Sequence, residues 1–340
     1  MSGAANDLGP RRFFQHLSEN YENQYWEYEK RLGFGAFGYT ALLKSKGPPG
    51  QPGKRMAVKF AVGTTSNRQG TLRTEINFLK TFNGASHIVS ILASCEDIGP
   101  VVALEYLEHG DMNGLMLKLR QRERTVPNTV LWSLFFCLIR ASVGMAYPPR
   151  HPVGSDVKIT EVIPSDGTRE SQLAHNDFNA RNIMLGVGDG RHSEHGMGIM
   201  AKLIDFGTVT LGHGSLQNIF DAAFTISFLI TPATGISNQT CMYRGQRTRA
   251  VNLVGTGEPP FPLPQSLTND VKWLDPELRD LLARCTYFDP TQRPTLSDVL
   301  QIAQNAVQSK VAESFPIPDM ETTSAVKSFI QEFILDVPGQ

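Results

Sequence analysis

The chain has 340 residues, of which 41% are hydrophobic, so it can build a sizeable core and has the length of about two ordinary domains. Its 32 basic and 33 acidic side chains leave a formal net charge of −1. This balance argues against electrostatic binding to nucleic acid or to an anionic membrane, and neither is expected as a partner.

The four cysteines are separated and form no CxxC pair, so the sequence predicts neither a disulfide framework nor a structural zinc site. The longest apolar runs, Leu131–Ile139 and Ala222–Ile230, are shorter than a bilayer-spanning helix, and no hydrophobic signal sequence opens the chain. We therefore expect an intracellular protein, cytoplasmic or nuclear.

Residues 1–24 are rich in glycine, proline, asparagine and clustered charge, which predicts a flexible lead-in. Tyr25–Leu32 is aromatic and charged, as in an exposed strand, and runs into the glycine-rich stretch 33–38, GFGAFG. Tyr39–Leu43 is strand-like again. Because a dinucleotide-binding GxGxxG needs a helix after the glycines, this order favours a hairpin whose glycines approach a phosphate.

A Gly/Pro-rich loop, residues 47–53, separates this hairpin from the apolar strand Met56–Phe60, which contains Lys59. Next comes Thr71–Phe82, whose apolar residues have helical spacing, and this predicted helix contains Glu75. Taken alone, Lys59 could face water on an edge strand and Glu75 could lie on a solvated helix face.

Two further strands are predicted at His87–Leu92 and Val101–Leu104, followed by a helix that starts near Gly110–Asp111. An aspartate at that position is also a good helix cap. Val130–Met145 is apolar on most faces, which predicts a buried helix.

Two polar stretches, Pro148–Gln172 and Gly186–Met200, read as inserted loops. The second contains His192 and His195. With no carboxylate or cysteine pattern beside them, a solvated loop explains these histidines better than a metal site does.

The stretch with the most chemistry is residues 175–182, HNDFNARN, with Asp205-Phe206-Gly207 downstream. Phosphoryl transfer to an alcohol needs one carboxylate that orients and deprotonates the hydroxyl, plus a second carboxylate and an amide that hold Mg²⁺. Apolar segments at Ile183–Leu185 and Leu203–Ile204 would hold these polar loops at the ends of buried strands. Ordinary turn residues are the alternative, although the order HxDxxxxN…DFG makes it the weaker one.

Taken together, these motifs resemble the eukaryotic protein kinase family over residues 26–308. The resemblance implies an α+β, two-lobed protein-kinase-like fold, with a small antiparallel-sheet N-lobe carrying one helix and a larger, mainly helical C-lobe. After the lead-in, residues 25–107 would form the N-lobe and hinge, 108–310 the C-lobe, and 311–340 a tail with a short helix.

The resemblance also implies roles for the candidate residues. Asp177 would orient the acceptor hydroxyl, and Arg181 would neutralise developing charge. The Lys59–Glu75 pair would position phosphate, while Asn182 and Asp205 would hold Mg²⁺. Leu104 would stand beside the adenine pocket. The implied nucleotide contacts are Gly33, Gly35, Gly38, Ala57, Lys59, Glu105, Leu107, Asp111 and Met184.

Several positions depart from the family pattern. No Ala-Pro-Glu follows Asp-Phe-Gly, and the next expected helix opens at Asp221 soon afterwards. Arg293 matches the arginine that pairs with the missing glutamate. Asn176 stands where the family has an arginine, and Asn179 where serine/threonine kinases place a lysine, so the type of acceptor hydroxyl stays open.

The sequence thus predicts an ATP- and Mg²⁺-dependent phosphotransferase, with a protein substrate bearing a Ser/Thr or Tyr hydroxyl. A pseudokinase scaffold is a second reading, because Ala-Pro-Glu is missing. A small-molecule kinase of the aminoglycoside or choline phosphotransferase type is a third. The shortened segment also leaves room for a regulatory partner.

Overall fold

The computed structural model describes residues 26–35, 38–46, 53–61, 66–96, 99–149, 151, 157–188, 198–231, 240–254 and 271–336. The predicted lead-in at 1–24, most of the loop at 47–53 and both loop histidines, His192 and His195, lie outside these residues. The chain divides into two compact units, one of residues 1–106, 148–159 and 205–209 and one of residues 107–147, 160–204 and 210–340.

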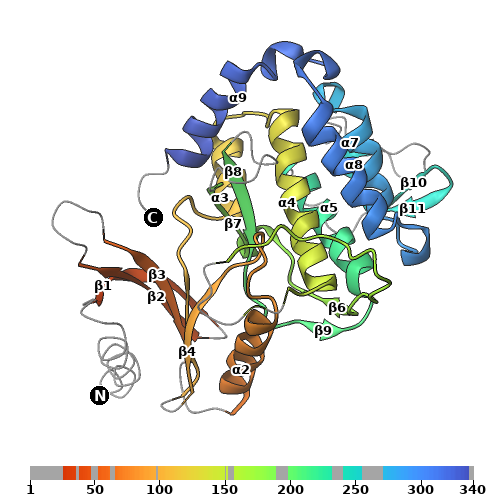
Figure 1. Cartoon of the computed structure of the whole chain (residues 1–340). Coiled ribbons are helices and arrows are strands. Elements are labelled where there is room, and N and C mark those ends of the chain that lie inside the picture. Colours follow the sequence, from red (N-terminus) through yellow and green to blue (C-terminus); the bar gives the residue numbers. More distant parts are fainter. Residues whose placement is uncertain are drawn as a thin grey trace. The chain divides into compact units, whose positions relative to one another are not determined.

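The first unit is built on a five-stranded antiparallel sheet of order β1-β2-β3-β5-β4 (Figure 1). Its elements are β1 (Trp26–Gly35), β2 (Gly38–Ser45), β3 (Arg55–Phe60), α2 (Ser66–Thr81), β4 (Ile91–Cys95) and β5 (Val101–Glu105).

Strand β3 shows why this sheet can carry a site. Met56, Val58 and Phe60 alternate into a buried core with residues of β2, β4 and β5. Because successive side chains point to opposite faces, Ala57 and Lys59 lie on the other face of the strand. The predicted helix is α2, which buries Leu72, Ile76 and Leu79 as its spacing indicates.

One predicted strand of this unit is misplaced. β4 begins at Ile91, so most of the predicted strand His87–Leu92 is buried coil. The backbone N–H and the hydroxyl of Ser90 both donate to Oε1 of Glu105, at 2.7 and 2.6 Å. These side-chain bonds take the place of a ladder bond and delay the start of the strand.

The second unit is mainly helical, with small two-stranded sheets. Its elements are α3 (Met112–Gln121), α4 (Asn128–Ala146), β6 (Leu173–Ala174), β7 (Ile183–Val187), β8 (Ile199–Leu203), β9 (Thr210–Leu211), α5 (Gly214–Ile230), β10 (Cys241–Tyr243), β11 (Gln246–Thr248), α6 (Val251–Val254), α7 (Pro276–Cys285), α8 (Leu296–Ser309) and α9 (Thr323–Ile330).

Helix α4 is the centre of this unit and packs against α5, α8 and β8. By length and composition its 19 residues would suffice to cross a membrane, although the uninterrupted apolar run Leu131–Ile139 within it is shorter. However, 94% of its apolar window is buried inside the protein, as predicted for a core helix. Among the described helices, no other passes the same test.

Two helices downstream of Asp-Phe-Gly bear on the sequence predictions. Helix α5 begins at Gly214 and not at Asp221, so the segment after Asp-Phe-Gly is shorter still than expected. His213, which precedes the helix, makes no side-chain capping bond, and the usual sequence signal for a helix start is therefore missing. In the tail at 311–340, for which a short helix is expected, the structure has α9, continued by a π-helical turn at Gln331–Leu335.

Candidate active site

Lys59 is the centre of a buried ion cluster in the first unit. Its Nζ donates to Oε2 of Glu75 at 2.7 Å and to Oδ1 of Asp205 at 3.1 Å. The side chains of Lys59 and Glu75 are only 12% and 2% exposed. The alternatives of a water-facing lysine and a solvated glutamate are therefore wrong.

The two carboxylates of the cluster keep Lys59 protonated. Burial lowers the pKa of Lys59, but the Glu75 and Asp205 carboxylates outweigh it and raise this pKa above its ordinary value. Burial raises the pKa of Glu75, and Lys59 opposes that change. Lys59 is thus a fixed positive charge at neutral pH, held between two carboxylates.

The two residues after Asp205 pack around this cluster. The ring of Phe206 is fully buried and lies 5.1 Å, centroid to centroid, from the ring of Phe82. A Cβ added at Gly207 would lie 3.1 Å from Cγ2 of Thr71, so a larger residue would press on α2. Asp205 itself has a positive φ of 64°, which is uncommon for a non-glycine residue and is typical of functional turns.

Asp177 lies in the second unit, where two amides fix its carboxylate. Nδ2 of Asn179 donates to Oδ1 at 2.5 Å, and Nδ2 of Asn182 donates to Oδ2 at 2.8 Å. A further bond from Nδ2 of Asn182 reaches the backbone oxygen of Asp177, also at 2.8 Å. The role of Asn179 was not predicted from the sequence, where it appeared only as the replacement for a lysine.

His175 anchors the same loop from within the core. It is fully buried, and its Nδ1 accepts from the backbone N–H of Asp177 at 3.3 Å. Its Nε2 lies 3.1 Å from the carbonyl oxygen of Ile204, to which it can donate. Ile204 also donates its own N–H to the backbone oxygen of Asn182 at 2.9 Å. The loop of Asp177 is therefore tied to the residue that directly precedes Asp205.

The glycine stretch forms the predicted hairpin. Gly33 pairs with Thr40, and Gly35 pairs with Gly38 across β1 and β2, with residues 36–37 outside the described part. Gly38 has a φ of 146°, and a Cβ there would lie 2.0 Å from the carbonyl oxygen of Phe60. No other residue fits that position without moving the strand.

The remaining nucleotide candidates fall in both units. Ala57 on β3 and Glu105 at the end of β5 belong to the first unit. The N–H of Glu105 donates to the carbonyl oxygen of Ser90. Leu107, Asp111 and Met184 lie in the second unit. Oδ1 of Asp111 accepts from the N–H of Gly114 at 2.7 Å, so this side chain caps α3, the alternative considered from the sequence.

Arg181 and Arg293 differ in how they are held. Arg181 is exposed on the short helical turn that follows Asn179. Arg293 donates to the backbone oxygens of Tyr287 and Leu216, both at 2.8 Å, and lies 4.5 Å from the ring centroid of Phe220. Backbone carbonyls and a ring thus occupy this arginine in a chain that lacks the Ala-Pro-Glu glutamate.

Asp221 is half-buried near Arg293 on the inner side of α5. Burial raises its pKa to about 6, although a hydrogen bond from Nε2 of Gln217 and the nearby Arg293 and Arg249 oppose the rise. Its carboxylate is therefore less completely ionised than an ordinary aspartate near neutral pH.

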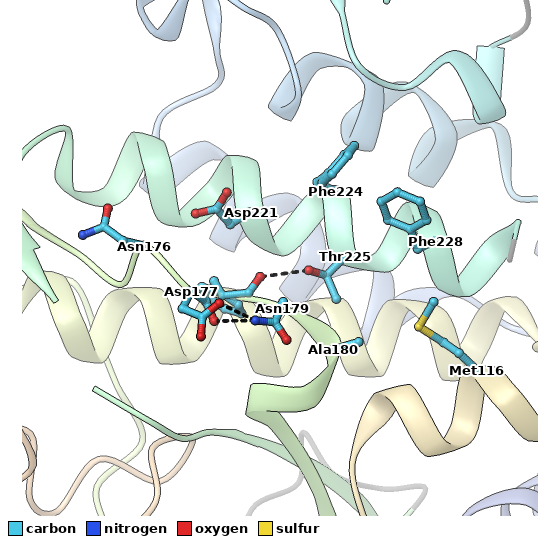
Figure 2. Close-up of a pocket in the computed structure, with 10 residues that line it drawn as sticks. Met116, Asn176, Asp177, Asn179, Ala180, Asp221, Phe224, Thr225 and Phe228 are labelled. Carbon is cyan, nitrogen blue, oxygen red and sulfur yellow. Dashed lines mark hydrogen bonds between the residues drawn. The ribbon is translucent and has the colours of Figure 1, made fainter. Parts of the chain in front are cut away.

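A cavity of about 280 Å³ opens beside Asp177 within the second unit. Figure 2 shows Asp177 and Asn179 facing it from the loop, with Phe224, Phe228 and Met116 on its other walls. One signal for these walls was present in the sequence, the spacing of Phe220, Phe224 and Phe228 along one helix face, but nothing placed them beside Asp177.

The predicted magnesium ligands have suitable donor atoms. Mg²⁺ prefers oxygen ligands, usually one or two carboxylates together with phosphate and water. Both side-chain hydrogen bonds of Asn182 use Nδ2, which leaves the amide oxygen without a partner among the described residues. Asp205 uses Oδ1 towards Lys59. Among the described residues, no cluster of three or more His, Cys, Asp or Glu side chains forms an alternative metal site.

Residues 26–154 match the family model of protein tyrosine and serine/threonine kinases. The matched segment contains Lys59, Glu75 and Asp111, whereas Asp177, Asn182 and Asp205 lie beyond its end. This match confirms the resemblance for that part of the chain. Together with the antiparallel N-terminal sheet and the mixture of helices and strands, it supports a kinase-like α+β fold.

Proposed function

We propose that the protein is a two-lobed, ATP-dependent protein kinase that transfers the γ-phosphate of ATP to a protein hydroxyl. The observation that carries the proposal is the cluster of Lys59, Glu75 and Asp205. Burying a lysine with two carboxylates is costly, and such a cluster is more common at a functional site than in a structural core.

Within this proposal, Lys59 presents its ammonium group to the nucleotide phosphates, and Glu75 keeps it in place. The glycine hairpin brings backbone N–H groups close to phosphate oxygens, a role that Gly38 serves by allowing a conformation closed to other residues. Ala57, on the same face of β3 as Lys59, and Met184 contribute apolar contact for the base. The backbone groups of Glu105 and Leu107 would bind its edge.

Asp177 is proposed to take the proton of the acceptor hydroxyl. The bonds from Asn179 and Asn182 hold both carboxylate oxygens, so the group does not need to reorient as the reaction proceeds. Asn182 and Asp205 would each supply an oxygen to Mg²⁺, which, when bound, offsets the charge of the phosphates. Arg181 would add positive charge from the same loop.

The first test of this proposal is nucleotide binding. Mg-ATP should raise the melting temperature, because a ligand that binds only the folded state stabilises it. Lys59→Met and Asp205→Asn should each reduce this shift. An unchanged wild-type melting curve at saturating Mg-ATP would remove the nucleotide site. A shift without phosphotransfer to any acceptor would favour the pseudokinase scaffold instead.

A further inference from the structure

The cavity beside Asp177 has a shape and lining that bear on the acceptor. We define the acceptor pocket by its ten lining residues: Met116, Asn176, Asp177, Phe178, Asn179, Ala180, Asp221, Phe224, Thr225 and Phe228. All ten belong to the second unit. Its volume of about 280 Å³ is below the roughly 300–1,000 Å³ of pockets that hold drug-sized ligands, so it suits a single side chain.

The walls of the acceptor pocket are mainly apolar and aromatic. Phe224 and Phe228 stand edge to face, with ring centroids 4.8 Å apart and planes at 82°. Both rings and Met116 are half-buried, so each offers apolar surface that a ligand could cover. An edge-to-face pair of this kind accepts a third ring readily, because aromatic rings prefer tilted or offset contacts.

The polar part of the pocket carries no cation. Its lining contains two carboxylates, two carboxamides and one hydroxyl, but no lysine or arginine. Oγ1 of Thr225 is occupied, since it donates to the backbone oxygen of Phe178 at 3.0 Å. The charge of Asp221 is offset by Arg293 and Arg249, which lie outside the lining. An acidic side chain would therefore be poorly accommodated.

We propose that the acceptor pocket binds the ring of a tyrosine side chain, and that the acceptor of this kinase is therefore a phenol and not an aliphatic alcohol. The proposal rests on the proposed function. A serine or threonine hydroxyl is one carbon away from the main chain and would leave the apolar walls uncovered. A tyrosine carries its hydroxyl at the far end of a ring that can cover Phe224, Phe228 and Met116.

The chemistry balances with ATP as the phosphoryl donor. The phenol oxygen forms the new bond to the γ-phosphorus, and the bond from that phosphorus to the oxygen shared with the β-phosphate breaks. ADP leaves with the electron pair of that bond, and the phenolic proton passes to the Asp177 carboxylate. A phenol has a pKa of about 10, so it gives up this proton more readily than an aliphatic alcohol does.

The turnover test uses three degenerate peptide libraries that differ only in a fixed central residue, tyrosine, serine or threonine. With Mg-ATP, the tyrosine library should be phosphorylated at least about ten-fold faster, since a covered ring contributes more than a factor of ten in binding. Equal or faster phosphorylation of the serine or threonine library would overturn the proposal. A preference for serine libraries with a neighbouring aromatic residue would also overturn it, because the pocket would then hold that neighbour.

Variants on one helix supply a matched comparison. Phe228→Ala should raise KM for a tyrosine peptide about ten-fold, with the Mg-ATP melting shift retained. Leu216→Ala is the control, because this side chain is also half-buried on α5 but does not line the pocket. An equal rise in KM for both variants would contradict the pocket, since it would indicate a general effect on the helix.

A binding measurement separates this proposal from the proposed function. With ¹³C-methyl methionine, the Met116 signal, assigned by Met116→Leu, should shift on titration with N-acetyl-tyrosinamide and not with N-acetyl-serinamide. If no library is phosphorylated, the proposed function fails, yet this shift would still support a ring-binding pocket. If the libraries are phosphorylated and the Met116 signal stays unmoved by the tyrosine compound, the pocket proposal alone is overturned.

Discussion

Nδ2 of Asn179 lies 2.5 Å from Oδ1 of Asp177. This bond makes a carboxamide, in a position where serine/threonine kinases place a lysine, part of the arrangement that fixes the proposed base. The backbone N–H of Arg181 in turn donates to Oδ1 of Asn179 at 2.9 Å, so the amide cannot rotate away without losing two bonds.

Asn179→Ala should therefore lower kcat by roughly ten-fold, because a hydrogen bond to a charged group is worth about 1.5–3 kcal/mol and part of it is replaced by water. The KM for ATP should stay near the wild-type value. Initial rates with Mg-ATP and an acceptor measure both. Asn305→Ala on α8 is the control, since Asn305 also accepts a side-chain bond but is remote in sequence and exposed. A kcat equal to wild type would show that Asn179 does not position Asp177.

The Lys59 cluster predicts an unequal effect on stability. Lys59→Met leaves the buried carboxylate of Glu75 and the half-buried carboxylate of Asp205 without their cation, which should lower the free energy of unfolding by about 3–5 kcal/mol. Adding Glu75→Gln to Lys59→Met should recover part of this loss, because one of the two repelling charges is removed. Urea denaturation measures the three proteins.

A matched pair, Glu27 on β1 and Lys46 directly after β2, provides the control for this prediction. Lys46 and Glu27 lie 2.8 Å apart, but their side chains are 67% and 60% exposed. Water screens such a pair, so Lys46→Met should change the free energy of unfolding by less than about 1 kcal/mol. Similar losses for Lys59→Met and Lys46→Met would contradict the account of Lys59.

Asp221 predicts a pH dependence with a defined sign. Its folded-state pKa is raised from 3.8 to about 6, so the folded state holds its proton more tightly than the unfolded state. The resulting stabilisation is complete below pH 3.8 and is lost as the pH rises through 6. The free energy of unfolding of Asp221→Asn, minus that of wild type, should thus be about 1–3 kcal/mol higher at pH 7 than at pH 4.

Urea denaturation across this pH range checks the Asp221 prediction. Asp289 should show a pH dependence of stability with the opposite sign. Side-chain and backbone bonds from Thr291 lower the pKa of Asp289. Its contribution is therefore present above its ordinary pKa and is lost as the pH falls, and Asp289→Asn should be the less stable protein at neutral pH. A stability difference for Asp221→Asn that does not change with pH would refute the raised pKa.

The short segment after Asp-Phe-Gly predicts the absence of a phosphorylation switch. Ser215 is buried and donates to Oε2 of Glu170 at 2.5 Å, so a phosphate there would meet a carboxylate. Thr210 accepts from Nδ2 of Asn176 at 2.8 Å, where the family has an arginine. Activity should therefore be unaffected by phosphatase, and the combined change of Thr208, Thr210 and Ser215 to alanine should not abolish it.

Turnover before and after phosphatase treatment, in wild type and in the triple variant, is the measurement for this prediction. A large phosphatase-sensitive activity that disappears in the triple variant would overturn it. If phosphorylation does not switch the activity, we expect a partner bound to the shortened segment or to the 148–172 insertion to regulate it.

Local patterns predicted the elements with strong periodicity. The alternation of Met56, Val58 and Phe60 and the helical spacing within Thr71–Phe82 were sufficient to place Lys59 and Glu75 on neighbouring elements. The ion cluster itself depends on a tertiary contact with Asp205, which only the order of the motifs indicated.

Features that depend on tertiary packing were beyond the sequence. The capping bond of Asp111 and its implied nucleotide contact are indistinguishable in a single sequence, because both use an aspartate before a helix. The walls of the acceptor pocket come from α3, the loop at residues 176–180 and α5, which are far apart in the chain. No local pattern reports how such segments meet.

The most direct test of the account compares wild type with Asp177→Asn in Mg-ATP turnover against the acceptor libraries. The account predicts that the variant keeps its Mg-ATP melting shift and loses about 10²–10⁴-fold in kcat, the usual contribution of a general base. Equal turnover by the two proteins would contradict the role of Asp177 in the reaction.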